Sequence, residues 1–355
     1  MGNRVTMKDI AEEASVSTGT VHRAIYGKKG VTEEVRQQIL EICAKRGYRA
    51  NTAASALKRG TTRIVAAFPG PTVQNRFFYA NVWQGFRRCI GEMEGYNLEV
   101  VELPYYPETS SDQANELMAC YERYNGEIDA LVTVGHFDTK CKSVVKKYVN
   151  HGIPVFLACD DTPDCGRIAC VQANYDITGR ITAELMASQL PEKSAVLLCA
   201  GDVLIPSHYQ TVIGFEEYMK ENRPDLQILK VNGYYNSDEL TSRLGHTLDT
   251  RTDIAGAFGV SARLSVLLAR LIVERGLEKK IRIVASDLFA ETAANMEKGI
   301  VQNIIFKDPE QQAYMATRVM CDQLFKAQKP LSEVQYVESR IIFRSGLDMY
   351  RKYVV

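Results

Sequence analysis

The sequence predicts an α/β protein in which an all-helical N-terminal unit precedes a two-lobed body built on doubly wound parallel sheets. Three observations support this. A chain of 355 residues is too long for one ordinary core. Short helical segments occupy residues 1–50, and strand-like and helical segments alternate from Arg63 onward. We therefore expect a helical domain over 1–50, a linker over 51–60 and a body over 61–355. Within the body, we expect one lobe over about 61–172 and 303–330, and the other over about 173–302 and 331–355.

Composition indicates a soluble globular protein, with 46% hydrophobic and 24% charged residues. No stretch approaches the roughly 18 apolar residues of a membrane span, and no secretory signal follows the start, so we expect a cytoplasmic protein. The nine cysteines lack metal-ligand spacing, and Cys159, Cys165 and Cys170 form their only cluster. We expect reduced thiols, no metal and no cofactor.

Charge is distributed unevenly although the net charge is zero. Residues 1–60 contain 11 Lys/Arg against 6 Asp/Glu, and the remainder contains 32 against 37. A basic end on an acidic body predicts that only the first segment meets a polyanion such as nucleic acid.

Each of the three N-terminal helices has its own start and stop signals. Thr6 and Asp9 form a capping-box pattern that opens the first helix, which breaks at Ser15-Val16. Ser17 can cap a second helix that runs through Ile25. A third helix starts at Thr32 and stops at Gly47.

The second helix has one apolar and one polar side. Val21 and either Ala24 or Ile25 face the first helix, which leaves Thr18, Gly19, His22 and Arg23 on the outer side. Two short helices joined by a tight turn and backed by a third are the plan of a helix-turn-helix DNA reader, but a generic three-helix bundle would show the same pattern.

The run Val5–Ala14, then Val16-Ser17 and Thr20–Arg23, resembles the DNA-binding signature of the lac-repressor (LacI) family of bacterial transcription regulators, and Val31–Arg36 and Gly47-Tyr48 continue it. The resemblance implies that Thr18, Gly19 and Arg23 occupy base-reading positions, and that four further residues lie near phosphates: Thr6, Ser17, Thr20 and His22. Arg23 can bridge N7 and O6 of guanine, although an arginine that only neutralises phosphate remains an alternative.

Residues 51–60 have good helix propensity but are too few to form a stable helix alone in water. In the family this segment becomes helical when two subunits bind an operator. The resemblance implies that Leu57 wedges into the minor groove, with Lys58 and Arg59 on phosphates. The alternative is a plain interdomain linker.

In the body, strands and amphipathic helices alternate, which predicts parallel sheets with helices on both faces. The helices include Asn81–Glu92, Asp176–Leu190, Tyr209–Asn222 and Ala262–Arg275. The expected strands are Ile64–Phe68, Leu98–Glu102, Ala130–Val134, Val155–Ala158, Ala195–Cys199, Leu226–Val231, Ile254–Phe258, Ile281–Ala285 and Val301–Phe306. These strands are too many for one sheet of ordinary size, so we expect two lobes. No nucleotide-binding, nucleophile-elbow or metalloprotease motif is present, so no catalytic residue is assigned and an enzyme is not expected.

The body resembles the sugar-binding domain that LacI regulators share with type I periplasmic binding proteins, through pieces such as Gly95-Tyr96, Gly214-Phe215 and Phe306–Pro309. In that architecture the ligand lies between the lobes, beyond the carboxyl ends of strands. Asp287 is the strongest candidate because the resemblance places an effector-contacting acid there. The candidate effector residues are Asn75, Phe77, Tyr79, Tyr105, His136, Asp160, Asp287, Phe289 and Lys307; for each aromatic residue, ordinary core packing is the alternative.

Two departures from the family pattern bear on the effector. Thr211 stands where an arginine is frequent, and Lys307 stands where glutamine is frequent. Lys307 could compensate for the missing arginine, meet an anionic effector or point to solvent. We expect a neutral sugar or polyol first, an anionic sugar derivative second and a non-sugar ligand third.

The resulting prediction is a bacterial transcription regulator that acts as a repressor. It binds a near-palindromic double-stranded DNA operator on the nucleoid, and it does so as a homodimer. A small carbohydrate-like effector between the lobes would change its operator affinity. The chain lacks the heptad tail that tetramerises lac repressor, which favours a dimer. The alternatives are an extracytoplasmic sugar-binding receptor or a sugar-modifying enzyme.

Overall fold

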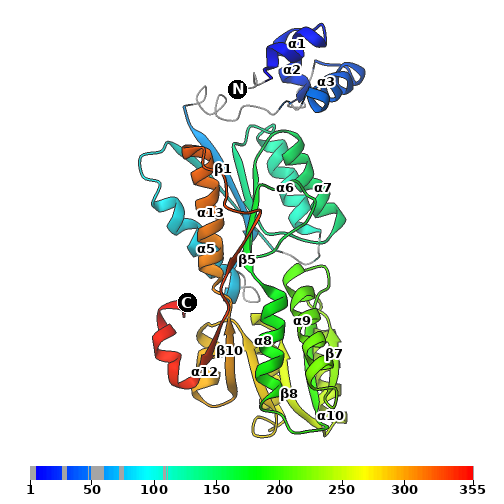
Figure 1. The fold of residues 1–355 in the computed structure, drawn as a ribbon, viewed down its shortest axis with the longest axis vertical. Helices are drawn as coiled ribbons and strands as arrows, with labels where there is room; N and C mark the ends of the chain where they lie inside the picture. The colour runs from blue at the N-terminus through cyan, green and yellow to red at the C-terminus, as the bar shows by residue number, and fades with distance from the viewer. Residues whose placement is uncertain are drawn as a thin grey trace.

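The computed structural model describes residues 5–25, 30–46, 48, 60–71, 76–106, 109 and 111–354. A helical headpiece (residues 5–48) lies beyond one end of a body in which two α/β lobes are stacked along the long axis (Figure 1). None of the described helices is long and apolar enough to cross a membrane.

The headpiece consists of α1 (Met7–Glu13), α2 (Thr18–Ile25) and α3 (Glu33–Arg46) around a small apolar core. The capping box predicted for α1 is confirmed. The Asp9 amide donates to Oγ1 of Thr6 at 3.3 Å, and the Asp9 carboxylate accepts from the Thr6 amide at 2.7 Å. Val21, Ala24 and Ile25 of α2 are buried against the other two helices, as their spacing predicts.

The turn between α1 and α2 requires a left-handed backbone at Ser15, whose φ is +54°. Glycine adopts this conformation without steric cost, whereas a side chain disfavours it. Ser15 therefore occupies a position that suits glycine better.

The first lobe contains a six-stranded parallel sheet in the order β11-β5-β4-β3-β1-β2. Alternate residues of β1 face opposite sides of it. Helices α5 (Arg76–Gly91) and α13 (Pro309–Lys326) cover one face, and α6 (Asp112–Arg123) and α7 (Thr139–Asn150) cover the other. The strands are β1 (Thr62–Pro69), β2 (Leu98–Tyr105), β3 (Ala130–Thr133), β4 (Val155–Ala158), β5 (Ala169–Ala173) and β11 (Val334–Val337).

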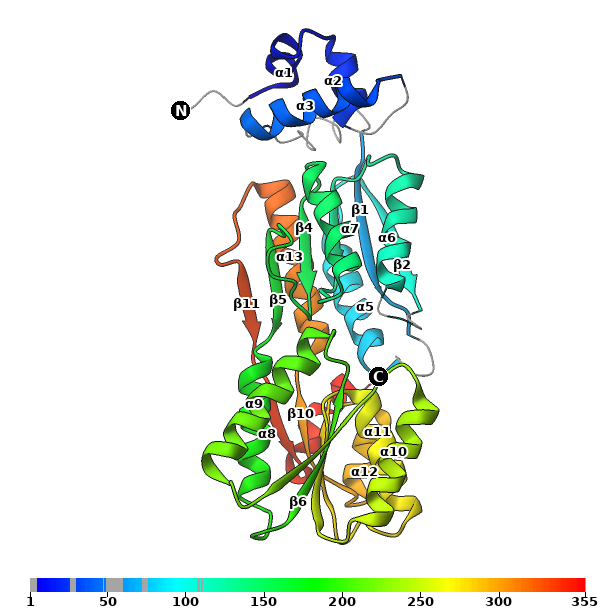
Figure 2. The ribbon, with the colours of Figure 1, turned by 90° about the vertical axis from the view of Figure 1, so that its right-hand side faces the viewer.

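The second lobe contains a six-stranded sheet in the order β12-β10-β9-β8-β6-β7, in which only β12 is antiparallel to its neighbour. Helices α8 (Tyr175–Ala187) and α9 (Pro206–Asn222) pack together on one side; α10 (Ser237–Thr250), α11 (Ala262–Glu274) and α12 (Ala290–Glu297) lie on the other (Figure 2). The strands are β6 (Ala195–Gly201), β7 (Gln227–Asn232), β8 (Ile254–Gly259), β9 (Arg282–Ser286), β10 (Val301–Phe306) and β12 (Arg340–Phe343), and the 3₁₀ helix η1 (Arg344–Tyr353) follows. The predicted fold class is confirmed.

Two glycines allow α8 and α9 to approach closely. A Cβ atom at Gly179 would lie 2.1 Å from the carbonyl oxygen of Thr211, and one at Gly214 would lie 2.1 Å from that of Asp176. Any side chain at either position would separate the two helices.

Strand pairing corrects the expected lobe boundaries near the C-terminus. The expected division at 302/303 cuts through β10, which lies wholly in the second sheet. β11 was expected in the second lobe but pairs with β5 of the first. The chain therefore crosses between lobes over 173–175, 306–309 and 337–340, and β5, β11 and β12 were absent from the predicted strands.

Candidate functional site

The outer side of α2 presents the polar residues that the sequence predicts to meet DNA. Thr18, Gly19 and Arg23 are exposed, and His22 is half-buried. Because the opposite side of the helix is anchored in the headpiece core, this surface is held on a rigid support.

Hydrogen bonds organise three of these side chains into a row. Oγ of Ser17 accepts from the Thr20 amide at 3.1 Å and lies 2.9 Å from Oγ1 of Thr20, which in turn accepts from Nη2 of Arg23 at 3.3 Å. The row orients the Arg23 guanidinium along the exposed surface. Thr6, by contrast, uses its hydroxyl in the capping box of α1. Leu57 and Lys58 lie outside the described residues, as does Asn75 of the body.

Loops that follow strands of both lobes surround a hollow of about 520 Å³, here called the first hollow. This volume includes space that opens to solvent. Phe77 and Tyr79 follow β1, Asp160 follows β4, and the second lobe contributes Asp287 after β9 and Lys307 after β10. The structure thus brings together five of the predicted effector residues.

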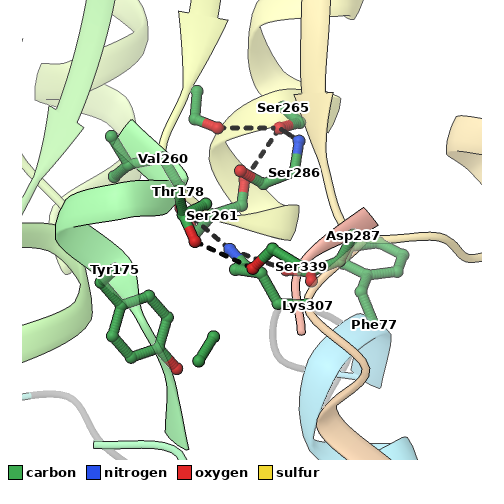
Figure 3. Close-up of polar contacts among 12 residues, drawn as sticks. Phe77, Tyr175, Thr178, Val260, Ser261, Ser265, Ser286, Asp287, Lys307 and Ser339 are labelled. Carbon is green, nitrogen blue, oxygen red and sulfur yellow. Dashed lines mark hydrogen bonds and ion pairs between the residues drawn. The ribbon is translucent and has the colours of Figure 1, made fainter. Parts of the chain in front are cut away.

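Asp287 and Lys307 form a buried ion pair at the wall of this hollow. Nζ of Lys307 lies 3.1 Å from Oδ2 of Asp287 and donates to the carbonyl oxygen of Val260 at 3.3 Å. Burial raises the pKa of Asp287, and the Lys307 charge opposes this rise. Oδ1 of Asp287 has no hydrogen-bond partner among the described residues, so it remains available to a ligand hydroxyl. Figure 3 shows the pair with Phe77 beside it.

Asp160 joins the two lobes directly. Its Oδ1 accepts from the Ser207 amide at 2.6 Å, in the first turn of α9, a helix whose N-cap residue Ile205 provides no capping side chain. The first-lobe carboxylate therefore caps a second-lobe helix, where the helix dipole favours negative charge. Burial nevertheless raises the pKa of Asp160 to about 6.

Several polar residues of the first hollow were not predicted from the sequence, among them Ser207, His208, Ser261 and Arg263. Nδ1 of His208 accepts from the Asp202 amide at 3.2 Å, and burial lowers the pKa of His208 to about 3, so the ring is neutral with its proton on Nε2. Ser261 and Arg263 lie in the first residues after β8. The rule that selected the other candidates, a polar residue just beyond a strand end, would also have found these.

Phe289 has a supporting position rather than a lining one. It is buried and stacks on Phe77 with ring centroids 4.4 Å apart, which packs the second lobe against the first. Tyr105 and His136 line a second, adjoining hollow together with Tyr79 and Asp160. Of the nine predicted effector residues, only Asn75 cannot be placed, because it lies outside the described residues.

The nine cysteines are all buried, and none of them forms a disulfide bond. No cluster of three or more metal-ligating side chains occurs in the described part of the chain.

Comparison with known proteins identifies both parts of the chain. Residues 65–328 match the family model described as periplasmic binding protein domain, and residues 6–51 match the model described as bacterial regulatory proteins, lacI family.

Among curated proteins, the chain is 28% identical over 136 residues to catabolite control protein A of Streptococcus mutans, which covers 38% of each protein. It is 36% identical over 93 residues to the ribose operon repressor of Haemophilus influenzae, which covers 26% of this chain and 27% of that one. The matched segments thus span less than half the length of these relatives.

Among solved structures, a solute-binding protein of an ABC transporter from Agrobacterium vitis with bound D-fucose superimposes with a TM-score of 0.73. The match covers 82% of this chain and 99% of that one at 19% identity, and shows a shared fold.

Proposed function

Because the chain belongs to the periplasmic binding protein domain family and begins with a lacI-family DNA-binding segment, we propose that it is a transcription regulator whose operator affinity is set by a carbohydrate bound between its lobes. The observation that carries the proposal is the presence, in one chain, of an exposed polar α2 surface and a charged hollow between two lobes. The regulator acts in the bacterial cytoplasm, as a homodimer on a near-palindromic operator.

For DNA recognition, α2 enters the major groove and Arg23 reads a base edge. Thr18 and Gly19 approach neighbouring base edges, while Thr6, Ser17, Thr20 and His22 approach phosphates. Leu57 and Lys58 act in the segment between headpiece and body, where the leucine wedges into the minor groove.

The effector is a carbohydrate for two reasons. The first hollow combines aromatic faces with hydrogen-bonding side chains, among them His208, Arg263 and the Asp287–Lys307 pair, which suits a ring with hydroxyls on its edge. In addition, one relative is a ribose operon repressor and one structural neighbour was solved with bound D-fucose. We place Asp287, His208 and Arg263 on ligand hydroxyls and Phe77 on the ring face.

Closure of the lobes links the two sites. The Asp160–Ser207 hydrogen bond and the Phe77–Phe289 stack both span the cleft, so a ligand that seals the cleft favours this arrangement of the lobes. Since the first lobe leads through residues 51–60 to the headpiece, a change in lobe arrangement alters how two headpieces are spaced. Whether this weakens or tightens operator binding depends on which arrangement holds the headpieces at the operator spacing.

The test is operator selection from random-sequence DNA with the full chain, followed by fluorescence anisotropy with and without sugars. We expect a near-palindromic site whose affinity changes at least tenfold with one sugar, and loss of this response in Asp287→Asn with operator affinity retained. Asp249→Asn, an exposed acid on α10 that pairs with Arg275, is the matched control and keeps the response. Failure to select any sequence contradicts the proposal.

The similarity to solute-binding proteins gives a second candidate, an extracytoplasmic sugar receptor. A receptor binds sugar but selects no DNA sequence, so the same experiment separates the two. A sugar-modifying enzyme would consume the bound sugar, which analysis of the sugar after incubation detects.

A further inference from the structure

The cleft contains a second hollow of about 450 Å³ that adjoins the first. Tyr79, Asp160 and Tyr234 line both, so the two spaces meet at these side chains. The cleft between the lobes therefore contains two adjoining spaces, each lined by aromatic and polar side chains.

Two polar groups in the second hollow are shielded from water without a partner. Nε2 of Gln113 donates to Oγ1 of Thr133 at 2.9 Å and to the carbonyl oxygen of Val134 at 2.6 Å, which fixes the amide and leaves its buried oxygen without a hydrogen bond among the described residues. Nδ1 of His136 accepts from the Asp138 amide at 3.0 Å, so Nε2 carries the proton, and it too has no partner in the described part of the chain. The Gln113 oxygen and the His136 Nε2–H group are thus a buried acceptor and a buried donor that a ligand can satisfy.

The remaining lining is aromatic and nearly uncharged. Tyr79, Tyr105, Tyr234 and Tyr235 provide ring faces and hydroxyls. Among the described residues of the lining, Asp160 is the only acidic side chain and there is no lysine or arginine. Burial lowers the pKa of His136, so its ring is neutral. Such a surface suits a neutral ring whose C–H face lies on an aromatic side chain while its hydroxyls reach a donor and an acceptor.

We propose that the effector is a neutral disaccharide, with one ring in the first hollow against Asp287 and Arg263 and the second ring in the second hollow against Tyr105, His136 and Gln113. Asp160 lies at the junction and accepts a hydroxyl hydrogen near the glycosidic bond. This inference rests on the proposed function and extends it, because it assigns the second hollow to a second sugar ring.

Isothermal titration calorimetry of the full chain tests the inference. The probes are maltose, cellobiose, lactose, trehalose, melibiose and sucrose, together with glucose, galactose and fructose. We expect one disaccharide to bind at least tenfold more tightly than either of its constituent monosaccharides.

Two conservative variants locate the second ring. Tyr105→Phe removes a hydroxyl, and His136→Asn keeps an acceptor near the position of Nδ1 but removes the Nε2 donor. Each should weaken disaccharide binding about five- to tenfold, the usual effect of one lost hydrogen bond, and leave monosaccharide binding unchanged. Tyr209→Phe, an exposed tyrosine of α9 that lines neither hollow, is the matched control and changes neither affinity.

The inference is overturned if monosaccharides bind as tightly as every disaccharide, if no disaccharide binds, or if the two variants weaken both ligands equally. A monosaccharide that alone changes operator affinity would overturn the second subsite and leave the proposed function intact. Absence of any selected operator would instead contradict the proposed function, whatever the calorimetry shows.

Discussion

The ammonium of Lys307 lies 3.1 Å from the carboxylate of Asp287, and both side chains are at least 95% buried. They follow the neighbouring strands β9 and β10, so the parallel sheet itself brings them together. The sequence left open whether Lys307 points to solvent or meets an anionic effector. The pair excludes the solvent-facing alternative, and it neutralises the Lys307 charge that an anionic effector would meet.

Breaking this pair should destabilise the protein. Lys307→Met leaves a buried carboxylate without its cation, which lowers the free energy of unfolding by about 3–5 kcal/mol. The double variant Lys307→Met/Asp287→Leu recovers much of this loss because neither charge remains. Urea denaturation measures both. Arg270→Met, which breaks the exposed Arg270–Glu274 pair, is the control and should change stability by less than about 1 kcal/mol. Equal losses in the single and double variants would refute the coupling.

The raised pKa of Asp160 predicts a specific pH dependence. Burial raises this pKa from 3.8 to about 6, so the folded protein holds the proton more tightly than the unfolded chain. The contribution of Asp160 to the free energy of unfolding is therefore fully present below pH 4 and is lost as pH rises through about 6. The total loss is roughly 2–3 kcal/mol.

Asp160→Asn keeps an acceptor for the Ser207 amide but does not titrate. The difference in unfolding free energy between wild type and this variant should therefore fall between pH 4 and 6 and stay level above 7. For Asp249, whose pKa is lowered by Arg275, the corresponding difference should rise with pH at the acid end. A pH-independent difference for Asp160 would show that its carboxyl titrates normally.

Arg23 should contribute base preference rather than general affinity. Arg23→Ala removes the guanidinium held by Thr20, and discrimination at one position of each half-site should drop by about 1–3 kcal/mol. Binding to a panel of single-base operator variants measures this. Arg270→Ala on α11 is the control. A uniform loss across all sequences would instead assign Arg23 to phosphate contact.

Ser15→Gly should stabilise the headpiece. The positive φ of Ser15 costs a residue with a side chain about 1 kcal/mol more than glycine, so the headpiece transition should move to higher temperature or urea concentration. Ser188→Gly, at a helix C-cap with φ of −74°, is the matched control and should be neutral or slightly destabilising. Destabilisation by Ser15→Gly would contradict the turn geometry.

The sequence alone predicted the headpiece well because its signals are local. The Thr6–Asp9 capping box, the α1–α2 turn and the inward positions of α2 depend on residues within one or two helical turns. Nine strands of the body were also predicted, since continuous apolar runs are typical of buried parallel strands.

The prediction of where the chain crosses between the lobes near its C-terminus was wrong for a physical reason. β11 contains exposed Tyr336 and only one buried residue, Val337, so it has no apolar run, and its place in the first lobe depends on backbone pairing with β5. Nothing in the local pattern distinguishes a strand that pairs with one sheet from a strand that pairs with the other.

What the sequence by itself determined was therefore the fold class, the polar outer side of α2 and the strand ends from which a ligand site would be built. Tertiary structure alone decided that Lys307 pairs with Asp287, that Asp160 caps α9 of the other lobe, and that Phe289 supports Phe77 from behind. Helix caps and apolar periodicity are fixed by neighbours in the chain. Partners across a cleft are fixed by packing between distant segments, which no local pattern records.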